Sequence, residues 1–350
     1  MKIAAGMPHP PLLPWHIDAP HRVASLGDLA LESGETIEDF RQSYVTHGVL
    51  DAQKPNAILV CSAITGTHHR LDFLIGAGKA LDPDRWFIIA ADAIGNGLST
   101  SPSISESQPG MRFPKFTIRD MIEAQRRFLA EELGIARLAA VVGASMGGMQ
   151  AVQWAVSYPE MVGSIVAMTA MARTSAWTLA VNEATRSCLM ADPCWDGTAF
   201  SDIPERGWRA WINVQRMLVG RTAQSVDAQF ADHEELLGWT ARLQREWLAA
   251  RFDAHDFLYQ SWAYDAHDVG ATPGFHGDAA EALRSFTAPA LVLAPPLDLY
   301  NPVDGAKAMA CMLPNARYVE IPSIHGHNAA AGASTRDIGF INETIRQFLA

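Results

Sequence analysis

The sequence predicts an α/β fold in which a mainly parallel central sheet is interrupted by a helical insertion. Short apolar runs alternate with helical patterns in the first half of the chain, and such runs return near its end. Between them lie long amphipathic patterns with little strand signal. We therefore expect a core made of residues 1–170 and 286–350, with residues 171–285 as the helical insertion.

The composition narrows the class of protein. The chain has 350 residues, of which 49% are hydrophobic and 19% are charged, as in a folded protein with a large core. Its formal net charge of −11 argues against binding to nucleic acid or to an anionic membrane, because both require a basic surface. We find no signal peptide, membrane span or C-x-x-C motif, and so expect a cytoplasmic protein with reduced thiols.

The individual elements follow from local patterns. Residues 118–133 carry apolar side chains at helical spacing, and Gly134 is suited to end that helix. Further helices are expected over residues 149–156 and 337–349. Tryptophan is concentrated in the insertion, where most of the rings should pack helices together. The predicted strands are residues 57–61, 86–90, 138–142, 164–168, 290–294 and 318–321.

The pentapeptide G-A-S-M-G at residues 143–147 is the most informative motif. It lies between a predicted strand and a predicted helix, which is the context of a nucleophile elbow. A serine in such a tight turn needs neighbours without side chains two residues away on either side. Its hydroxyl then stands above the sheet. Ser145 is therefore the candidate nucleophile, although a glycine-rich turn without chemistry is the alternative interpretation.

An activated serine needs a base and a carboxylate that orients the base. Asp298 follows the strand at residues 290–294, and His327 follows the strand at residues 318–321. Both fall at the carboxyl ends of predicted strands, in the chain order Ser, Asp, His that α/β-hydrolases show. Two alternatives stay open, since His325 could act as the base and Asp304 could replace the acid.

Two backbone amides should bind the oxyanion of a tetrahedral intermediate. One is the Met146 N–H, directly after the candidate nucleophile, and the other is the Ile64 N–H, in the loop after the strand at residues 57–61. The histidines lack the H-x-x-x-H spacing of a zinc helix and no cysteine joins them, so no metal or cofactor is expected.

Several segments together resemble the homoserine O-acetyltransferase family of α/β-hydrolase-fold proteins. The matching segments are residues 31–36, 62–66, 113–120, 145–150, 191–195 and 251–254. The resemblance implies an α/β-hydrolase fold with an inserted helical lid domain. It also implies Ser145 as nucleophile, Asp298 and His327 as its partners, and a homodimer formed through the lid.

Other segments depart from the transferase pattern. Ser62 stands where the transferases carry a histidine, and the lid motif T-Y-R-S is absent. Residues 94–103 and 326–332 instead resemble ester-hydrolysing relatives of the family. Arg216 aligns with a lid arginine that in the transferases could anchor an amino-acid carboxylate, and a surface or salt-bridged arginine is the alternative.

We expect a serine hydrolase that cleaves small acyl esters, acetate esters first, through an acyl-enzyme intermediate. The alternative is a homoserine O-acetyltransferase-type acyltransferase, in which acetyl-CoA is the donor and a bound hydroxyl displaces the enzyme. A fold without catalytic activity, serving as a scaffold, is a third interpretation that the three candidate residues argue against. In the first two cases the partner is a small molecule.

Overall fold

The computed structural model describes residues 12–350 except residues 52 and 54. A single eight-stranded sheet runs through it in the order β1-β2-β4-β3-β5-β6-β7-β8. The strands are β1 (Arg22–Ala30), β2 (Thr36–His47), β3 (Ala57–Cys61), β4 (Phe87–Ala91), β5 (Ala140–Ala144), β6 (Ile165–Met168), β7 (Ala290–Ala294) and β8 (Ala316–Glu320).

The strands from β4 to β8 pair in parallel, whereas β1 and β2 form an antiparallel hairpin beside β4. Strand β3 shows why the centre of the sheet is apolar throughout. Its alternate residues enter two different hydrophobic cores, with Leu59 on one face and Ile58 and Val60 on the other. Buried parallel strands therefore read as continuous apolar runs.

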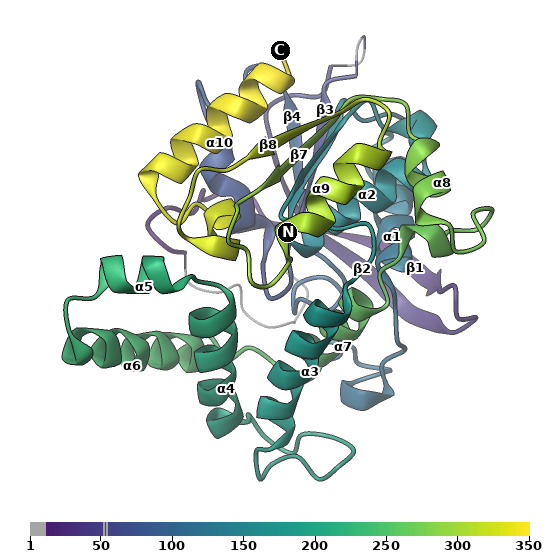
Figure 1. The fold of residues 1–350 in the computed structure, drawn as a ribbon. Helices are drawn as coiled ribbons and strands as arrows, with labels where there is room; N and C mark the ends of the chain where they lie inside the picture. The colour runs from purple at the N-terminus through teal and green to yellow at the C-terminus, as the bar shows by residue number, and fades with distance from the viewer. Residues whose placement is uncertain (1–11, 52, 54) are drawn as a thin grey trace.

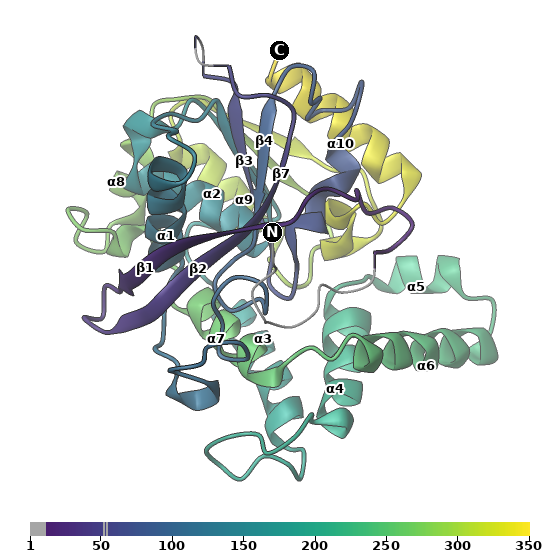
Figure 2. The same cartoon turned by 180° about the vertical axis from the view of Figure 1, so that it is seen from behind.

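Helices cover both faces of the sheet (Figures 1 and 2). On one face, side chains of α1, α2, α8 and α9 share a core with the sheet, and on the other face lie α10 and the short helix η1. The covering elements are α1 (Ile118–Glu131), α2 (Met146–Ser157), α8 (Ala279–Arg284), α9 (Val303–Met312), α10 (Thr335–Phe348) and η1 (His68–Leu74). The sheet is therefore buried on both faces beneath the site described below.

Between β6 and β7 the chain forms a helical lid with its own small core. Trp208, Trp211 and Trp247 are buried there and contact one another through their rings. In Figure 1, α5 and α6 form an arm that projects beyond the sheet. The lid helices are α3 (Ala176–Met190), α4 (Glu205–Ile212), the π-helix η4 (Asn213–Val219), α5 (Ala223–Gln229), α6 (His233–Ala249) and α7 (Ala254–Asp265).

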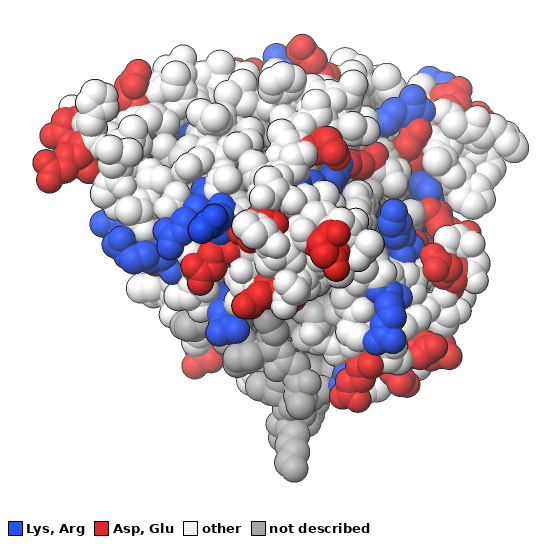
Figure 3. All heavy atoms as spheres, turned by 90° about the horizontal axis from the view of Figure 1, so that it is seen from below, with Lys and Arg blue, Asp and Glu red and all other residues white. Residues whose placement is uncertain are grey.

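The predicted fold class is confirmed, and the predicted strands and helices differ from the observed ones by a few residues at their ends. The hairpin of β1 and β2 was not among the predicted strands. Domain boundaries at residues 170 and 285 stay a prediction. In the described part of the chain, no helix combines the length and apolar character needed to cross a membrane. Acidic and basic side chains are interspersed over the face shown in Figure 3.

Candidate active site

Ser145 lies in a strained turn between β5 and α2, with φ 58° and ψ −125°. Its two flanking glycines are required by close approach of the backbone. A Cβ on Gly143 would lie 2.0 Å from the carbonyl oxygen of Gly147, and a Cβ on Gly147 would lie 2.4 Å from that of Cys61. Strain of this kind persists only where the surroundings enforce it, and it is common at catalytic residues.

The structure brings Ser145, His327 and Asp298 together at the carboxyl ends of β5, β7 and β8. Ser145 Oγ lies 2.9 Å from His327 Nε2, and His327 Nδ1 lies 2.8 Å from Asp298 Oδ2. All three residues are at least nine-tenths buried. The other carboxylate oxygen, Asp298 Oδ1, accepts hydrogen bonds from the backbone N–H groups of Tyr300 and Asn301. The carboxylate is thus held so that one oxygen faces the imidazole.

The two alternatives are placed elsewhere. His325 Nε2 lies 4.0 Å from Asp337 Oδ2, and its side chain is 29% exposed. Asp304 lies in the first turn of α9, in agreement with the helix expected around it. His327 contacts the Ser145 hydroxyl through Nε2 and the Asp298 carboxylate through Nδ1, as a base in a triad must. The structure therefore favours His327 and Asp298 over the two alternatives.

The loop of His327 is joined to the lid. The hydroxyl of Thr222 donates to the Ile324 carbonyl, and the Asn328 N–H donates to the Gly220 carbonyl over 3.2 Å. Gly326, directly before the histidine, has φ 55°, which favours glycine. Hydrogen bonds therefore connect the lid to the loop of the candidate base.

The two candidate oxyanion donors, the N–H groups of Met146 and Ile64, lie at the start of α2 and in the loop after β3. Met146 is the first residue of α2, so its N–H has no acceptor within the helix. Ile64 lies in the loop after β3, and its N–H has no hydrogen bond among the described backbone groups. The next residue, Thr65, has φ 55°, and its N–H donates to Gln260 Oε1 of lid helix α7 over 3.0 Å. Gln260 also donates to the Ile94 carbonyl and so ties this loop to the lid.

Asp92, directly after β4, stabilises the same loop after β3 through hydrogen bonds. Its buried carboxylate accepts from the backbone N–H of His68, from Asn96 and from Ser43. Burial alone would raise the pKa of Asp92, but the neighbouring His68 imidazole and the hydrogen bonds lower it well below its usual range. Asn96 in turn donates to the Gly66 carbonyl. This network fixes the loop that carries Ile64.

His21, His68 and Asp92 are the residues in the described chain that could hold a metal ion, since one donor atom of each lies within 4.8 Å of the others. His68 Nδ1 lies 2.9 Å and His21 Nε2 lies 3.8 Å from Asp92 Oδ2. Both carboxylate oxygens already accept hydrogen bonds from the protein. The arrangement fits a hydrogen-bonded network, and the expected absence of a metal stays a prediction.

Tyr264 and Asn301 are site residues that sequence reasoning missed. The Tyr264 hydroxyl lies 3.4 Å from Ser145 Oγ, and the Asn301 amide lies next to that hydroxyl. Tyr264 follows Gln260 by four residues, so both lie on one face of α7. A single tyrosine in a helical segment carries no motif, and only the helical spacing from Gln260 could have linked the two.

Arg216 lies in the π-helix η4, with its guanidinium 4.8 Å from the centre of the Trp247 ring. Burial, together with the charges of Arg70 and Arg221, lowers the pKa of Arg216 to about 10. In the described part of the chain, no carboxylate lies within ion-pair distance of these three arginines. Unpaired guanidinium groups of this kind favour an anion.

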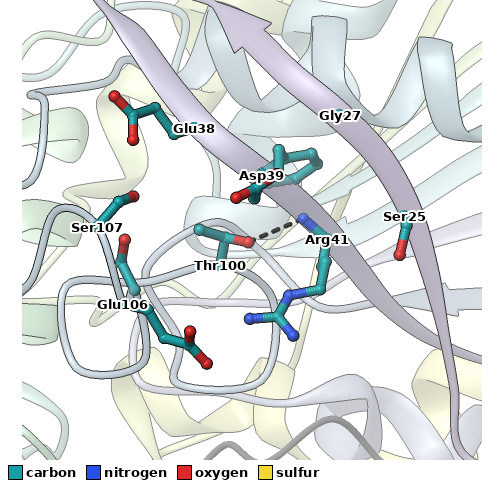
Figure 4. Close-up of a pocket in the computed structure, with 10 residues that line it drawn as sticks. Ser25, Gly27, Glu38, Asp39, Arg41, Thr100, Glu106 and Ser107 are labelled. Carbon is teal, nitrogen blue, oxygen red and sulfur yellow. Dashed lines mark hydrogen bonds between the residues drawn. The ribbon is translucent and has the colours of Figure 1, made fainter.

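A separate hollow of about 630 Å³ lies between the β1–β2 hairpin and the loop at residues 100–107 (Figure 4). Glu38, Asp39, Arg41 and Glu106 are among the residues that line it, and the Arg41 N–H donates to the Thr100 hydroxyl over 2.8 Å. None of the candidate catalytic residues lines it. The hollow therefore belongs to a different part of the surface.

The fold and this arrangement define an enzyme of the α/β-hydrolase class. Residues 56–327 match the family described as alpha/beta hydrolase fold, which is well over half of the chain. The protein therefore belongs to the alpha/beta hydrolase fold family, as the resemblance implied.

Among curated proteins, the chain is 34% identical to a homoserine O-acetyltransferase of Nostoc punctiforme over 333 residues, covering 91% of this chain and 92% of that one. Among solved structures, an acetylester hydrolase from Corynebacterium glutamicum has a TM-score of 0.88 at 30% identity, covering 94% and 96%. A homoserine O-acetyltransferase from Bacillus anthracis has a TM-score of 0.82 at 26% identity, covering 95% and 97%. Relatives of both activities are thus similar to this chain.

Proposed function

We propose that this enzyme transfers a small acyl group, acetyl first, through an ester formed on Ser145. The observation that carries the proposal is the continuous hydrogen-bonded chain from Ser145 Oγ through His327 to Asp298. A serine hydroxyl is a weak nucleophile unless an adjacent base takes its proton. Here the base contacts the hydroxyl on one side and its orienting carboxylate on the other.

The acylation step follows from this geometry. Ser145 Oγ attacks the acyl carbonyl carbon while His327 Nε2 takes the hydroxyl proton, and Asp298 stabilises the imidazolium. The carbonyl oxygen becomes an oxyanion, for which the N–H groups of Ile64 and Met146 are the proposed donors. When the intermediate collapses, the bond to the leaving group breaks, and His327 gives its proton to that group. An acyl-enzyme remains.

The acceptor decides between hydrolysis and transfer, and we propose the hydroxyl of homoserine as the first candidate. The curated homoserine O-acetyltransferase is similar over nine-tenths of both chains, which supports the alternative of the sequence analysis more than its main expectation. Arg216 supports the same candidate, because a guanidinium without an acidic partner suits the carboxylate of an amino acid. In this case His327 deprotonates the acceptor hydroxyl, which then attacks the acyl-enzyme.

Water is the second candidate acceptor. The acetylester hydrolase structure is more similar to this chain than the transferase structure, both in TM-score and in identity. The departures at Ser62 and at residues 94–103 and 326–332 support the same conclusion. The homodimer through the lid and the cytoplasmic location stay predictions under either candidate.

One pair of assays separates the two acceptors. We expect acetyl-CoA to release CoA when L-homoserine is added, and Ser145→Ala to abolish the release. Arg216→Gln should raise the KM for homoserine about tenfold or more, while turnover of p-nitrophenyl acetate stays near that of the wild type.

Turnover of p-nitrophenyl acetate that requires Ser145, without release of CoA that depends on homoserine, would establish the hydrolase and overturn the first candidate. An absence of any activity that requires Ser145 with either acyl donor would overturn the acyl-enzyme proposal for acetyl donors as a whole.

A further inference from the structure

We propose that Tyr264, on lid helix α7, is a catalytic residue that donates a hydrogen bond to Ser145 Oγ. The inference rests on the proposed acyl-enzyme function and assigns a second partner to the nucleophile. Tyr264 is fully buried, and its hydroxyl is 3.4 Å from Ser145 Oγ. That distance is longer than an ideal O–H···O bond, but catalytic hydrogen bonds are often long before substrate is bound.

The direction of the bond follows from counting protons. His327 Nδ1 faces the Asp298 carboxylate, so that nitrogen carries the proton and Nε2 is the acceptor for the Ser145 hydroxyl. The single proton of Ser145 is therefore committed to His327. What remains on Ser145 Oγ is acceptor capacity, and the Tyr264 O–H is positioned to use it.

Asn301 orients the tyrosine. Its Nδ2 lies 2.6 Å from the Tyr264 hydroxyl and also donates to the Thr169 carbonyl over 2.6 Å. Its Oδ1 accepts a hydrogen bond from the same hydroxyl over 2.8 Å. In the resting site the Tyr264 proton is therefore directed to Asn301 Oδ1, and Ser145 Oγ is the second acceptor within its reach. We infer that the proton turns to Ser145 Oγ when negative charge develops there, while Asn301 Nδ2 continues to donate to the phenolic oxygen. The Asn301 backbone N–H binds Asp298, so the same residue serves both sides of the site.

Tyr264 stays a donor over the working pH range. Burial raises the pKa of its hydroxyl well above the usual value, and its hydrogen bonds with Ser145 and Asn301 only partly oppose this. A neutral phenol at this position can donate but cannot act as a base. This separates its role from that of His327.

The hydrogen bond from Tyr264 should have its largest effect in deacylation, where Ser145 Oγ is the leaving group. In deacylation the acceptor oxygen attacks the acyl carbon, the C–Oγ bond breaks, and its electron pair moves to Oγ. The imidazolium of His327 returns its proton to Oγ, while Tyr264 keeps its own proton and stabilises the negative charge that develops there. The same bond stabilises Oγ during the first attack, so both half-reactions should gain.

The test compares Tyr264→Phe with Tyr259→Phe. Tyr259 is also buried on α7, but its hydroxyl donates to the carbonyls of Phe113 and Met111 and not to the site. With p-nitrophenyl acetate, we expect Tyr264→Phe to lower both the burst rate and the steady-state kcat about 10- to 100-fold, with KM nearly unchanged. Tyr259→Phe should keep both rates, even if the loss of its buried hydrogen bonds lowers the melting temperature.

Incorporation of 3-fluorotyrosine at position 264 gives a variant that keeps the donor and should restore the rates. Wild-type burst and steady-state rates in folded Tyr264→Phe would overturn the proposal, and so would a loss that 3-fluorotyrosine does not rescue. If the wild-type protein shows no turnover that requires Ser145, the proposed function fails first, which distinguishes the two failures.

Discussion

The site is built from two regions that differ in how they are held. The sheet supplies Ser145, Asp298 and His327 from turns at strand ends, with spacing set by the parallel strands beneath them. The lid supplies Tyr264 and Gln260 from one face of a helix. Under the proposed function, the sheet region carries the groups that make and break bonds, while the lid region adjusts those groups through single hydrogen bonds. Damage to the first should therefore abolish activity, and damage to the second should reduce it.

The largest expected effect tests the sheet region. His327→Ala should lower kcat for an acyl substrate about 10³- to 10⁶-fold, as much as Ser145→Ala, because the members of a triad act as a unit. His325→Ala is the matched control and should keep activity within a few-fold, because His325 faces Asp337. Steady-state rates of the purified variants measure both. Loss of activity in the His325 variant with retention in the His327 variant would exchange their roles.

The next effect compares a glycine of the elbow with a glycine of the lid. Gly147→Ala places a Cβ 2.4 Å from a backbone oxygen. The change should lower the free energy of unfolding by about 3 kcal/mol or more, and it should also lower the activity. Gly238, in α6, has open space around the position that a Cβ would take, and its change to Ala should stabilise the protein by about 0.5–1 kcal/mol. Chemical denaturation of the two variants measures the difference. A Gly147→Ala protein as stable and active as the wild type would refute the packing argument.

The smallest effect tests the seam between the two regions, where His267 is buried after α7 with Nε2 3.1 Å from the Met171 carbonyl. Burial lowers the pKa of His267 to about 4. The unfolded chain therefore binds a proton near its ordinary pKa of about 6.5, whereas the folded chain does not bind one until about pH 4, so stability falls as pH falls through this window. The loss is on the order of 3 kcal/mol.

Urea denaturation from about pH 4 to about pH 7 should show this loss in the wild type and a flatter dependence in His267→Gln. Equal pH dependence in the two proteins would show that the histidine is not the group responsible.

The two regions also differ in what the sequence could predict. The G-x-S-x-G motif, the chain order of the acid and the base, and the apolar strands are local patterns, so Ser145, Asp298 and His327 could be proposed from the sequence alone. The hairpin of β1 and β2 was missed because β1 is largely exposed, β2 buries polar side chains such as Gln42 and Ser43, and the register of the pair shifts.

The lid contribution could not be predicted for a different reason. Gln260 and Tyr264 act on residues far away in the chain, with sequence separations of 195 and 119 residues. No periodicity within α7 distinguishes a side chain that faces Ser145 from one that fills a core. Arg216 was expected from resemblance alone, and only the structure shows that its charge has no acidic partner among the described residues.

The contacts of Thr222 and Gly220 with the loop at residues 324–328 have a practical consequence for protein engineering. In a chimaera that receives the insertion of a relative, foreign residues would contact the loop that carries the proposed general base, His327. Such grafts should preserve activity only when the 324–328 loop is exchanged along with the insertion, because hydrogen bonds join the loop to the insertion.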